Sequence, residues 1–298
     1  MSKAKRDDPG DPFPCMENMT VKMIREYLTR KKSIIVPLGV IEQHGYHLPL
    51  KTDALIAAEV GRMIGEKTGV LVAPVITQSF SGGGLPGTIN ISPAVMSLVV
   101  SDTLLSLASQ GFRNFYLFLC HGGSENARAL DHALKLLLRT NPAFVEAMIA
   151  LLPIWKFRTG GLGWDGAVRE NDWHAGWLET SMILALAPEL ARMDEVALDD
   201  EPILESMLEH PDNYQHAEKI VDDPVVIPRL TQRDDIKVGV MGHPERASKE
   251  RGEKLIAATV EAASKKIAEL EAKADGVYRE VDFNPEPILL RDDDDEDA

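Results

Sequence analysis

The sequence predicts an α/β fold in which a mainly parallel sheet carries helices on both faces. In the N-terminal half, a short apolar segment, a loop and a segment with apolar residues at helical spacing follow one another four times. The apolar segments are rich in β-branched residues, as in Ser33–Leu38, which is typical of buried strands. A helix between consecutive strands returns the chain to the end of the sheet at which the previous strand began, so the strands run parallel.

The individual strands and helices follow from local signals along the chain. Thr20 is a good helix-capping residue, Pro93 fits a first helical turn, and Gly65 or Gly69 fits the end of a helix. The expected strands are 33–38, 70–76, 115–120 and 144–153. The expected helices are 20–28, 54–64, 93–110, 127–138, 174–186 and 246–274. Residues 188–235 are acidic and broken by prolines, and we expect them to be surface excursions.

Composition and charge indicate the domain organisation and exclude one class of partner. The chain has 298 residues and a formal net charge of −15. We expect an extended N-terminal arm at 1–17, a single domain at 18–275 and an acidic tail at 276–298. Six negative charges lie in the segment 292–298, which is typical of a solvated tail. The rest is also acidic and has no stripe of Lys or Arg, which argues against a nucleic-acid partner.

Cysteine usage and hydropathy indicate a cellular compartment. The two cysteines, Cys15 and Cys120, give no disulfide framework, so a reducing cytoplasm is expected. Cys120 ends a predicted strand and is expected to fill the core rather than act as a nucleophile. No apolar signal region follows the N-terminus, and no apolar run approaches the roughly 18 residues needed to span a bilayer. We therefore expect a soluble, cytoplasmic protein with no membrane partner.

A group of metal-binding side chains follows the first predicted strand. Glu42, His44, His47 and Asp53 lie within twelve residues, between this strand and the next predicted helix. Carboxylates mixed with imidazoles fit zinc, manganese or iron better than calcium, which prefers oxygen ligands. A polar pair in a turn is the alternative interpretation of Glu42 and His44.

A second group, His121 and Glu125, follows the third predicted strand. Because parallel strands bind ligands at their carboxyl ends, we expect this segment to lie beside the loop at 42–53. A buried, hydrogen-bonded imidazole is the alternative for His121, and its place opposite the first loop favours a metal ligand. Glu125 is expected either to bind a metal or to interact with the positive end of a helix dipole.

The substrate pocket is expected to have aromatic walls. Trp155, Trp164 and Trp173 lie in a segment rich in glycine and charge, which suits a mobile wall over a pocket better than a core. The glycine-rich loop 79–88 lacks the Gly-Lys-Ser/Thr of a phosphate loop. It could present backbone N–H groups to a substrate carbonyl or be a tight turn, and we include its Ser81 among the substrate-binding residues.

Several separated motifs resemble the creatininase (creatinine amidohydrolase) family. They are the segment 37–53, Leu85-Pro-Gly-Thr-Ile89, His121-Gly-Gly123, His174-Ala-Gly176 with Glu179-Thr-Ser181, and Gly239-Val-Met-Gly242. They stand in the family's order and cover about residues 18–270. The resemblance implies a three-layer α/β fold and a metal-dependent hydrolase with two divalent ions of zinc, manganese or iron per chain. It also implies a homo-oligomer, often a hexamer.

The resemblance also implies roles for individual residues. Glu42 and His121 match the ligands of one metal ion, and His44 matches a ligand of the second. Asp53 matches the carboxylate that bridges the two ions. His174 matches a catalytic histidine that lies close to the substrate.

The sequence departs from the family pattern in three places. Creatininase itself has His-Tyr-Glu-Asn where this chain has His121-Gly-Gly-Ser-Glu-Asn126. Many relatives have His-Gly-Gly-Asn, so this chain has features of both patterns. Glu125 is predicted as a ligand of the second metal and a catalytic residue, and Glu179 is an alternative ligand or a residue that supports one. Many relatives have Asp where His243 stands and a carboxylate where Trp177 stands. The missing aromatic residue after His121 argues against creatinine itself as the substrate.

These features predict hydrolysis of a ring amide in a small, polar, cyclic substrate by a hydroxide that bridges two metal ions. His174 would carry the proton to the departing atom. One alternative is a hydrolase that opens the carbocyclic ring of a keto-polyol such as 3-dehydro-scyllo-inosose at a C–C bond. The others are a formylamide hydrolase, a metal-dependent sugar isomerase and a non-catalytic scaffold stabilised by metal.

Overall fold

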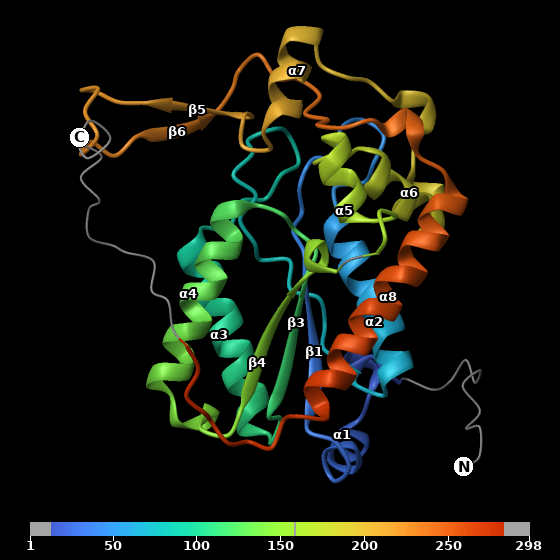
Figure 1. Cartoon of the computed structure of the whole chain (residues 1–298), viewed down its shortest axis with the longest axis vertical. Coiled ribbons are helices and arrows are strands. Elements are labelled where there is room, and N and C mark those ends of the chain that lie inside the picture. Colours follow the sequence, from blue (N-terminus) through green and yellow to red (C-terminus); the bar gives the residue numbers. More distant parts are fainter. Residues whose placement is uncertain (1–12, 158, 283–298) are drawn as a thin grey trace.

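The computed structural model describes residues 13–157 and 159–282, and a parallel sheet lies at its centre (Figure 1). Its four strands are β1 (Ser33–Leu38), β2 (Leu71–Val72), β3 (Asn114–Leu119) and β4 (Met148–Pro153). Their order in the sheet is β2–β1–β3–β4. β1 pairs with β3 in parallel along its whole length, from Ser33 opposite Asn114 to Leu38 opposite Leu119. The predicted parallel sheet is confirmed.

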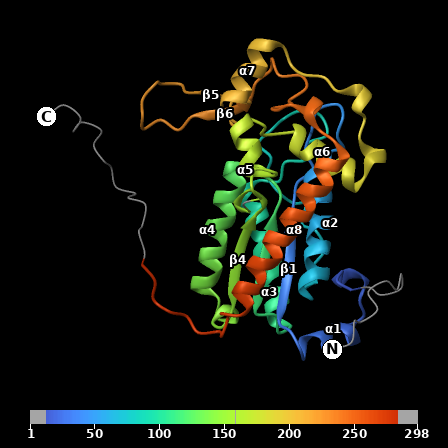
Figure 2. The ribbon, with the colours of Figure 1, turned by 45° about the vertical axis from the view of Figure 1, so that its right-hand side comes forward.

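Helices cover both faces of this sheet and complete the predicted three-layer sandwich. They are α2 (Thr52–Thr68), α3 (Pro93–Ser109), α4 (Ser124–Thr140), α6 (Trp177–Leu186) and α8 (Lys249–Glu271). A further helix, α1 (Val21–Leu28), lies below the amino ends of the strands (Figure 1). Figures 1 and 2 show α3 and α4 on one side of the sheet and α2 and α8 on the other. Because strand side chains alternate, Phe115 and Leu117 pack towards α3 and α4, whereas Tyr116 and Phe118 pack towards α2 and α8.

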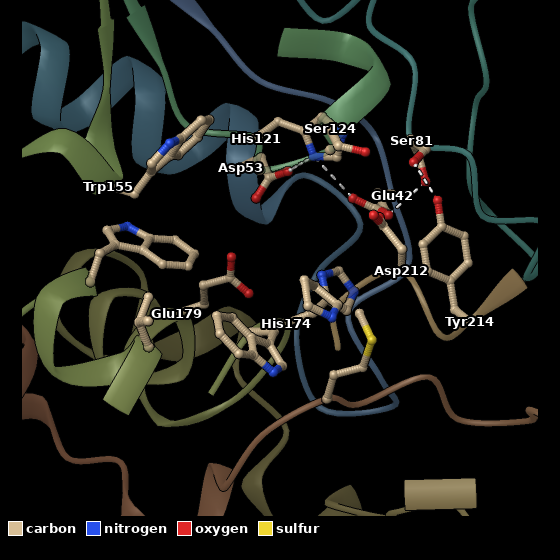
Figure 3. Close-up of a pocket in the computed structure, with 17 residues that line it drawn as sticks. Glu42, Asp53, Ser81, His121, Ser124, Trp155, His174, Glu179, Asp212 and Tyr214 are labelled. Atoms are coloured by element: carbon tan, nitrogen blue, oxygen red, sulfur yellow. Dashed lines mark hydrogen bonds and ion pairs between the residues drawn. The ribbon is translucent and has the colours of Figure 1, made fainter. Parts of the chain in front are cut away.

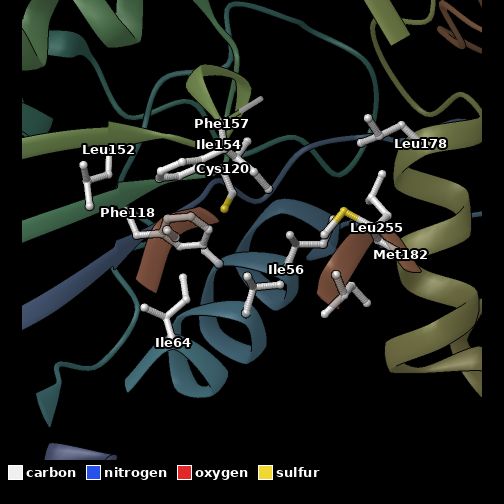
Figure 4. Close-up of a cluster of buried hydrophobic side chains, with 14 of the residues drawn as sticks. Ile56, Ile64, Phe118, Cys120, Leu152, Ile154, Phe157, Leu178, Met182 and Leu255 are labelled. Atoms are coloured by element: carbon white, nitrogen blue, oxygen red, sulfur yellow. The ribbon is translucent and has the colours of Figure 1, made fainter. Parts of the chain in front are cut away.

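The core on the α2 side encloses Cys120, which directly follows β3. Figure 4 shows its thiol among apolar side chains that include Ile56, Phe118, Ile154 and Phe157. Burial raises the pKa of this thiol well above its ordinary value. The thiolate is the nucleophilic form of cysteine, so this burial makes Cys120 inert. The prediction that Cys120 fills the core is confirmed.

Element boundaries near the site differ from the predicted ones. The segment 70–76 is a strand only at Leu71–Val72. Pro74 cannot donate a hydrogen bond to a neighbouring strand, although Ile76 still forms a bridge with Leu38. α2 and α4 begin at Thr52 and Ser124, earlier than predicted, so Asp53 and Glu125 belong to first helical turns.

Residues 188–235 contain more regular structure than the sequence indicated. They form α7 (Glu201–Glu209) and an antiparallel hairpin of β5 (Gln215–Glu218) and β6 (Arg229–Gln232). The tryptophan-rich segment also includes a short helix, α5 (Trp164–Ala167). Single 3₁₀ turns occur at Met16–Asn18, Pro142–Phe144, Ile154–Lys156, Val168–Glu170, Pro188–Leu190, Met193–Glu195 and Pro244–Arg246. The hairpin is the surface excursion that the sequence predicted.

The predicted arm and tail lie largely outside the described residues, which exclude 1–12 and 283–298. The division into an arm, a single domain and an acidic tail therefore stays a prediction. Within the described ranges, every helix is too short or too polar to cross a lipid bilayer.

A close contact between β1 and α2 sets the position of the site. A Cβ atom added to Gly39, directly after β1, would lie 2.6 Å from the Cα atom of Ala54. Only glycine therefore allows the start of α2 to approach the end of β1 this closely. The contact places Asp53, in the first turn of α2, beside the carboxyl end of the sheet.

Glu271, the last residue of α8, joins this helix to the amino-terminal parts of the central strands β1 and β3. Its Oε1 accepts hydrogen bonds from Ser33 Oγ at 2.5 Å and Tyr116 Oη at 2.6 Å. Asn114 Nδ2 donates to the same oxygen at 3.3 Å, and Lys31 Nζ lies 3.5 Å from Oε2. Burial opposes the charge of this carboxylate, but the hydrogen bonds from Ser33 and Tyr116 hold the pKa of Glu271 below its usual range.

Replacing this carboxylate should destabilise the fold. We expect Glu271→Ala to lower the free energy of unfolding by about 2 kcal/mol, because hydrogen bonds to a charged group are lost and buried donors lose their acceptor. Urea unfolding followed by circular dichroism measures this. Glu269→Ala, at an exposed carboxylate on the same helix, should change the free energy of unfolding much less. Equal effects of the two variants would contradict the role of Glu271.

The same effect should depend on pH. A folded-state pKa below the unfolded one gives stability that is present above the unfolded pKa of about 4.3 and is lost as pH falls through the folded value. The difference between wild type and Glu271→Ala should therefore shrink below about pH 4.

Candidate metal centre

Buried carboxylates and imidazoles converge at the carboxyl ends of β1 and β3 (Figure 3). Three sets of side chains have ligand atoms within 4.8 Å of one another: Glu42, Asp53 and His121; His44, Asp53 and Glu179; and Glu42, His44 and His174. The sequence predicted that the loop after β1 and the segment after β3 would meet here. The structure brings Glu42, His44, Asp53 and His121 together.

Asp53 lies between two imidazoles and offers one oxygen to each. Its Oδ1 is 3.3 Å from His44 Nε2, and its Oδ2 is 3.0 Å from His121 Nδ1. Glu42 Oε2 lies 3.3 Å from the same nitrogen of His121, and Glu179 Oε2 lies 3.7 Å from the same nitrogen of His44. Each half of the cluster thus has one imidazole nitrogen, one carboxylate of its own and one oxygen of Asp53. This donor set suits two divalent ions that share a bridging carboxylate.

The other nitrogen of each imidazole faces a backbone carbonyl. His44 Nδ1 donates to the carbonyl oxygen of Glu42 at 3.0 Å, and His121 Nε2 donates to that of Phe80 at 3.0 Å. When these imidazoles are neutral, the contacts favour the tautomers in which His44 Nε2 and His121 Nδ1 carry the lone pair, which is the form that binds a metal. His44 Nε2 is buried and has no hydrogen-bond partner among the described residues. A metal ion would satisfy this atom, so the residues present fit a divalent metal.

Hydrogen bonds also orient the other two carboxylates of the cluster, those of Glu42 and Glu179. Ser81 Oγ donates to Glu42 Oε1 at 2.6 Å, and Gly83 N donates to Ser81 Oγ at 3.0 Å. Ala175 N donates to Glu179 Oε2 at 2.7 Å. Ala175 has a positive φ of 52°, which is uncommon outside glycine and occurs often at functional sites.

Asp172 fixes the start of α6, from which Glu179 reaches the cluster. Its carboxylate accepts hydrogen bonds from Trp177 N at 2.9 Å, Leu178 N at 3.1 Å and His243 N at 2.8 Å. Capping of free N–H groups at a helix start by a carboxylate is favourable. No local pattern marks Asp172 in the sequence, because its partners come together only in the folded chain.

The charges of the cluster depend on one another. Burial alone would lower the pKa values of His44 and His121, but Asp53 beside His44 and Glu42 beside His121 raise them to about 10 and about 9. Burial raises the pKa of Glu179 to about 8. Burial also opposes the charge of Asp53, but the neighbouring His44 holds the pKa of Asp53 below its usual range. Without metal the imidazoles are therefore protonated at neutral pH and balance Asp53.

His174 lies beside the cluster and differs from His44 and His121 in its protonation state. Its ring centroid is 4.3 Å from that of His44, and its Nε2 lies 2.8 Å from the carbonyl oxygen of Gln43. Burial, together with the positive charge of His44, lowers the pKa of His174 to about 4. The imidazole of His174 is therefore neutral at physiological pH and is able to accept a proton.

The cluster opens into a cavity of about 250 Å³. The four residues predicted to bind substrate all line it: Ser81, Trp164, Trp173 and His174. Trp155 also lines it and packs edge-to-face against Trp164, with 6.5 Å between ring centroids. Asp212 and Tyr214 form a wall that the sequence did not predict, since no motif or periodicity marks them within 188–235.

Glu125 lies outside the metal cluster. Because α4 begins at Ser124, Glu125 is in the first helical turn, where its side chain is exposed, and it is Ser124 that lines the cavity. This position agrees with the helix-dipole interpretation. Of the two carboxylates considered for the second metal, Glu179 is the one within the cluster. His47 is also outside it, with Nε2 3.0 Å from Thr180 Oγ1.

Comparison with known proteins assigns this arrangement to a family. The model of the creatininase family, described as creatinine amidohydrolase, matches residues 17–267. The chain belongs to the creatininase family. It is therefore a metal-dependent hydrolase of this family, as the motifs predicted.

Three curated relatives carry different names. Creatinine amidohydrolase of Pseudomonas putida is 28% identical over 256 residues, which are 79% of this chain and 88% of the relative. Mycofactocin precursor peptide peptidase of Mycolicibacterium smegmatis is 27% identical over 256 residues, 82% and 87% of the two chains. The 3-dehydro-scyllo-inosose hydrolase of Thermotoga maritima is 30% identical over 190 residues, 62% and 60%. Membership of the family therefore leaves the substrate open.

Solved creatininase structures share the fold. A creatininase mutant superposes with a TM-score of 0.67 at 25% identity, covering 86% of this chain and 98% of that one. A mutant of the Zn–Zn type gives a TM-score of 0.68 at 24% identity, covering 86% and 97%. A form named creatininase Mn gives 0.66 at 23%, covering 86% and 98%. These likenesses show the fold. The fit to a metal rests on this chain's own buried ligand groups.

Removing the shared carboxylate should remove both ions. We expect zinc-loaded wild type to carry about two ions per chain and Asp53→Asn to carry fewer than one, because Asp53 offers an oxygen to each half of the cluster. Mass spectrometry of the metal content measures this, and circular dichroism checks the fold. Asp212→Asn is the matched control, because Asp212 lines the cavity but belongs to no ligand group. An Asp53→Asn protein that keeps two ions would contradict the bridge.

Metal binding should release protons. The pKa values of about 10, 9 and 8 for His44, His121 and Glu179 lie above pH 7, so these ligands must lose protons when zinc binds the metal-free protein. Apparent affinity should rise by about tenfold per pH unit for each released proton between pH 6 and 8. Calorimetry in buffers of different ionisation enthalpy counts the protons, and Glu179→Gln should release fewer. An affinity that does not change with pH would contradict this.

Proposed function

We propose that the protein is a binuclear metal-dependent hydrolase that cleaves a ring amide C–N bond of a small, polar, cyclic substrate. The observation that carries this proposal is the Asp53 carboxylate, which lies between two buried ligand groups beside the neutral imidazole of His174. A shared carboxylate suits two ions at short separation, and a neutral imidazole suits proton transfer during hydrolysis.

The chain's own residues would hold the two ions. Glu42 and His121 would complete one site with Asp53, and His44 and Glu179 the other. We assign Glu179, in place of Glu125, to the second ion, because only Glu179 lies within the cluster. Zinc, manganese and iron all suit this donor set, and bound ions would lower the pKa of a water molecule and polarise the substrate carbonyl.

His174 would carry the proton from the attacking water to the departing nitrogen. Its Nε2 lies 2.8 Å from the Gln43 carbonyl oxygen and 3.1 Å from the Gln43 side-chain amide nitrogen. In the tautomer in which Nε2 donates to the carbonyl, the lone pair of Nδ1 would accept the proton. The low pKa keeps this lone pair free at neutral pH, and the proton, once accepted, is readily passed on. Leaving of the amine would complete ring opening.

The cavity walls would select a small substrate and exclude water. Trp155, Trp164, Trp173 and Tyr214 enclose a volume of about 250 Å³. Trp164 lines this cavity, and its Nε1 is buried without a hydrogen-bond partner among the described residues. Ser81 and Trp173 line the same cavity beside His174.

A C–C hydrolase that opens a cyclic keto-polyol is the second candidate. The relative named 3-dehydro-scyllo-inosose hydrolase favours it, with 30% identity over 190 residues. Amide cleavage ranks first, because the relatives named creatinine amidohydrolase and mycofactocin precursor peptide peptidase both carry names of C–N bond cleavage. A formylamide hydrolase and a metal-dependent sugar isomerase follow. Gly122, where an aromatic residue stands in creatininase, argues against creatinine itself.

We also propose the setting in which the enzyme works. Its two cysteines are free, which suits a reducing cytoplasm. Its acidic charge of −15 suits a small-molecule substrate and no nucleic acid or membrane partner. The family resemblance favours a homo-oligomer, with a hexamer as the expected size.

Products and a variant at His174 test the proposal together. A screen of cyclic imides and other ring amides, formylamides and inososes should give a ring amide product heavier by one water, with a new amine detected by mass spectrometry. His174→Asn should lower kcat by about 10²–10⁴-fold, because proton transfer is lost, and leave the metal content unchanged.

Glu125→Gln is the matched control for this experiment. It should keep activity and metal content within about twofold, because Glu125 is exposed outside the cluster. Products of unchanged mass would indicate isomerisation, and a new C–C cleavage product without amine would favour the second candidate. Loss of activity in Glu125→Gln would return this residue to the catalytic machinery.

A further inference from the structure

The β5–β6 hairpin presents apolar side chains to solvent. Its outer segment, 219–228, carries Ile220, Val225 and Ile227, whose exposed fractions are 101%, 85% and 86%. Figures 1 and 2 both show this hairpin standing clear of the α/β body. A two-stranded hairpin alone is marginally stable in water, and contiguous exposed apolar residues mark interaction surfaces. The hairpin therefore lacks a partner that would cover its tip.

A groove between α3 and α4 is a second uncovered apolar surface. Its volume is about 700 Å³, and its walls include Ala94, Leu98, Ala133 and Leu136. Leu98 and Leu136 are 65% and 60% exposed. Helices of a soluble domain usually direct polar residues away from the sheet, so two exposed leucines on neighbouring helices also call for a partner.

We propose that the hairpin tip of one copy docks in the α3–α4 groove of a second copy of this chain. One surface projects and the other is hollow, and both are apolar. Their net charges are opposite. The tip carries Asp222 and Asp223 against the single Lys219, whose Nζ donates to the Asp223 carbonyl at 2.8 Å. Arg128 and His132 line the groove, with no carboxylate among its described lining residues. Complementary charge of this kind steers and orients association.

This occupant accounts for both surfaces at once. Each copy offers one tip and one groove, so a head-to-tail contact uses both in every copy when the rotation closes a ring. A foreign partner on the tip would leave the groove uncovered. The inference goes beyond the hydrolase reaction and does not rest on which bond the enzyme cleaves.

Docking of the hairpin tip would also affect the cavity beside the metal cluster, because the base of the hairpin contacts the wall of this cavity. At the root of the hairpin, Tyr214 Oη donates to the carbonyl of Ser81 at 3.3 Å, and Gly84 N donates to Gln232 Oε1 at 3.0 Å. Tyr214 lines the cavity, and Ser81 holds Glu42. Fixing the tip on a neighbouring copy would therefore restrain one wall of the cavity and the loop beneath it.

The oligomeric state of the full chain tests the proposal. Light scattering after size exclusion should show an oligomer for wild type. The double variant Ile220→Asp and Ile227→Asp should dissociate at a concentration at least tenfold higher than wild type. Both side chains are exposed in the single chain, so circular dichroism should not change. Val145→Asp, at an apolar residue 69% exposed outside both surfaces, is the matched control and should behave like wild type.

A charge exchange identifies the occupant. Asp222→Arg and Arg128→Asp should each weaken the oligomer, and the two together should restore it. With Ile220→Cys and Leu98→Cys in one chain, oxidation should give disulfide-linked dimers and higher species rather than cross-linked monomers.

Three results would overturn the inference. They are a monomeric wild type, an oligomer insensitive to the hairpin substitutions, and a cross-link confined to single chains. Assembly is measured without substrate, so its outcome is separate from that of the proposed reaction. An inactive protein that assembles through the tip would leave this inference standing and remove only the hydrolase proposal.

Discussion

Asp53 is a buried carboxylate on which the whole site depends. Only 2% of its surface is exposed, and a charge at such a depth is stable only with opposite charge close by. His44 and His121 supply this charge as imidazolium groups when no metal is bound. Two divalent ions would supply it in their place. The cluster is therefore balanced in both states, which allows the fold to form before metal binds.

This charge balance requires Asp53 to lie between His44 and His121, and the backbone sets that position. The close approach of Gly39 to Ala54 brings the start of α2 against the end of β1. His121 follows β3, which pairs with β1 in full register, so its imidazole meets Asp53 from the neighbouring strand end. The parallel sheet is thus the element that sets the distance between the two halves of the cluster.

The sequence could predict the part of the site that depends on this sheet. Glu42, His44, Asp53 and His121 follow strands whose apolar patterns are clear, and parallel strands place their carboxyl ends together. The choice between Glu125 and Glu179 depends instead on where α4 begins and on how α6 packs. Both features depend on tertiary packing, and no local sequence pattern marks them. Asp212 and Tyr214 lie in a segment without periodicity, so the wall they form was not predictable.

Contacts between segments that are distant in the sequence set the position of His174. Its backbone pairs with Met241, which donates from N to the His174 carbonyl at 2.8 Å and accepts from His174 N at 3.1 Å. Asp172 binds the N–H groups at the start of α6 and that of His243, so it holds both segments on one carboxylate.

Glycine is required at positions 176 and 242, since a Cβ atom at Gly176 or Gly242 would clash with the Asp172 carboxylate. The motifs 174–176 and 239–242 therefore act as one structural unit, although more than 60 residues separate them. Their joint function is to hold a neutral imidazole and Glu179 at fixed positions against the cluster that Asp53 organises.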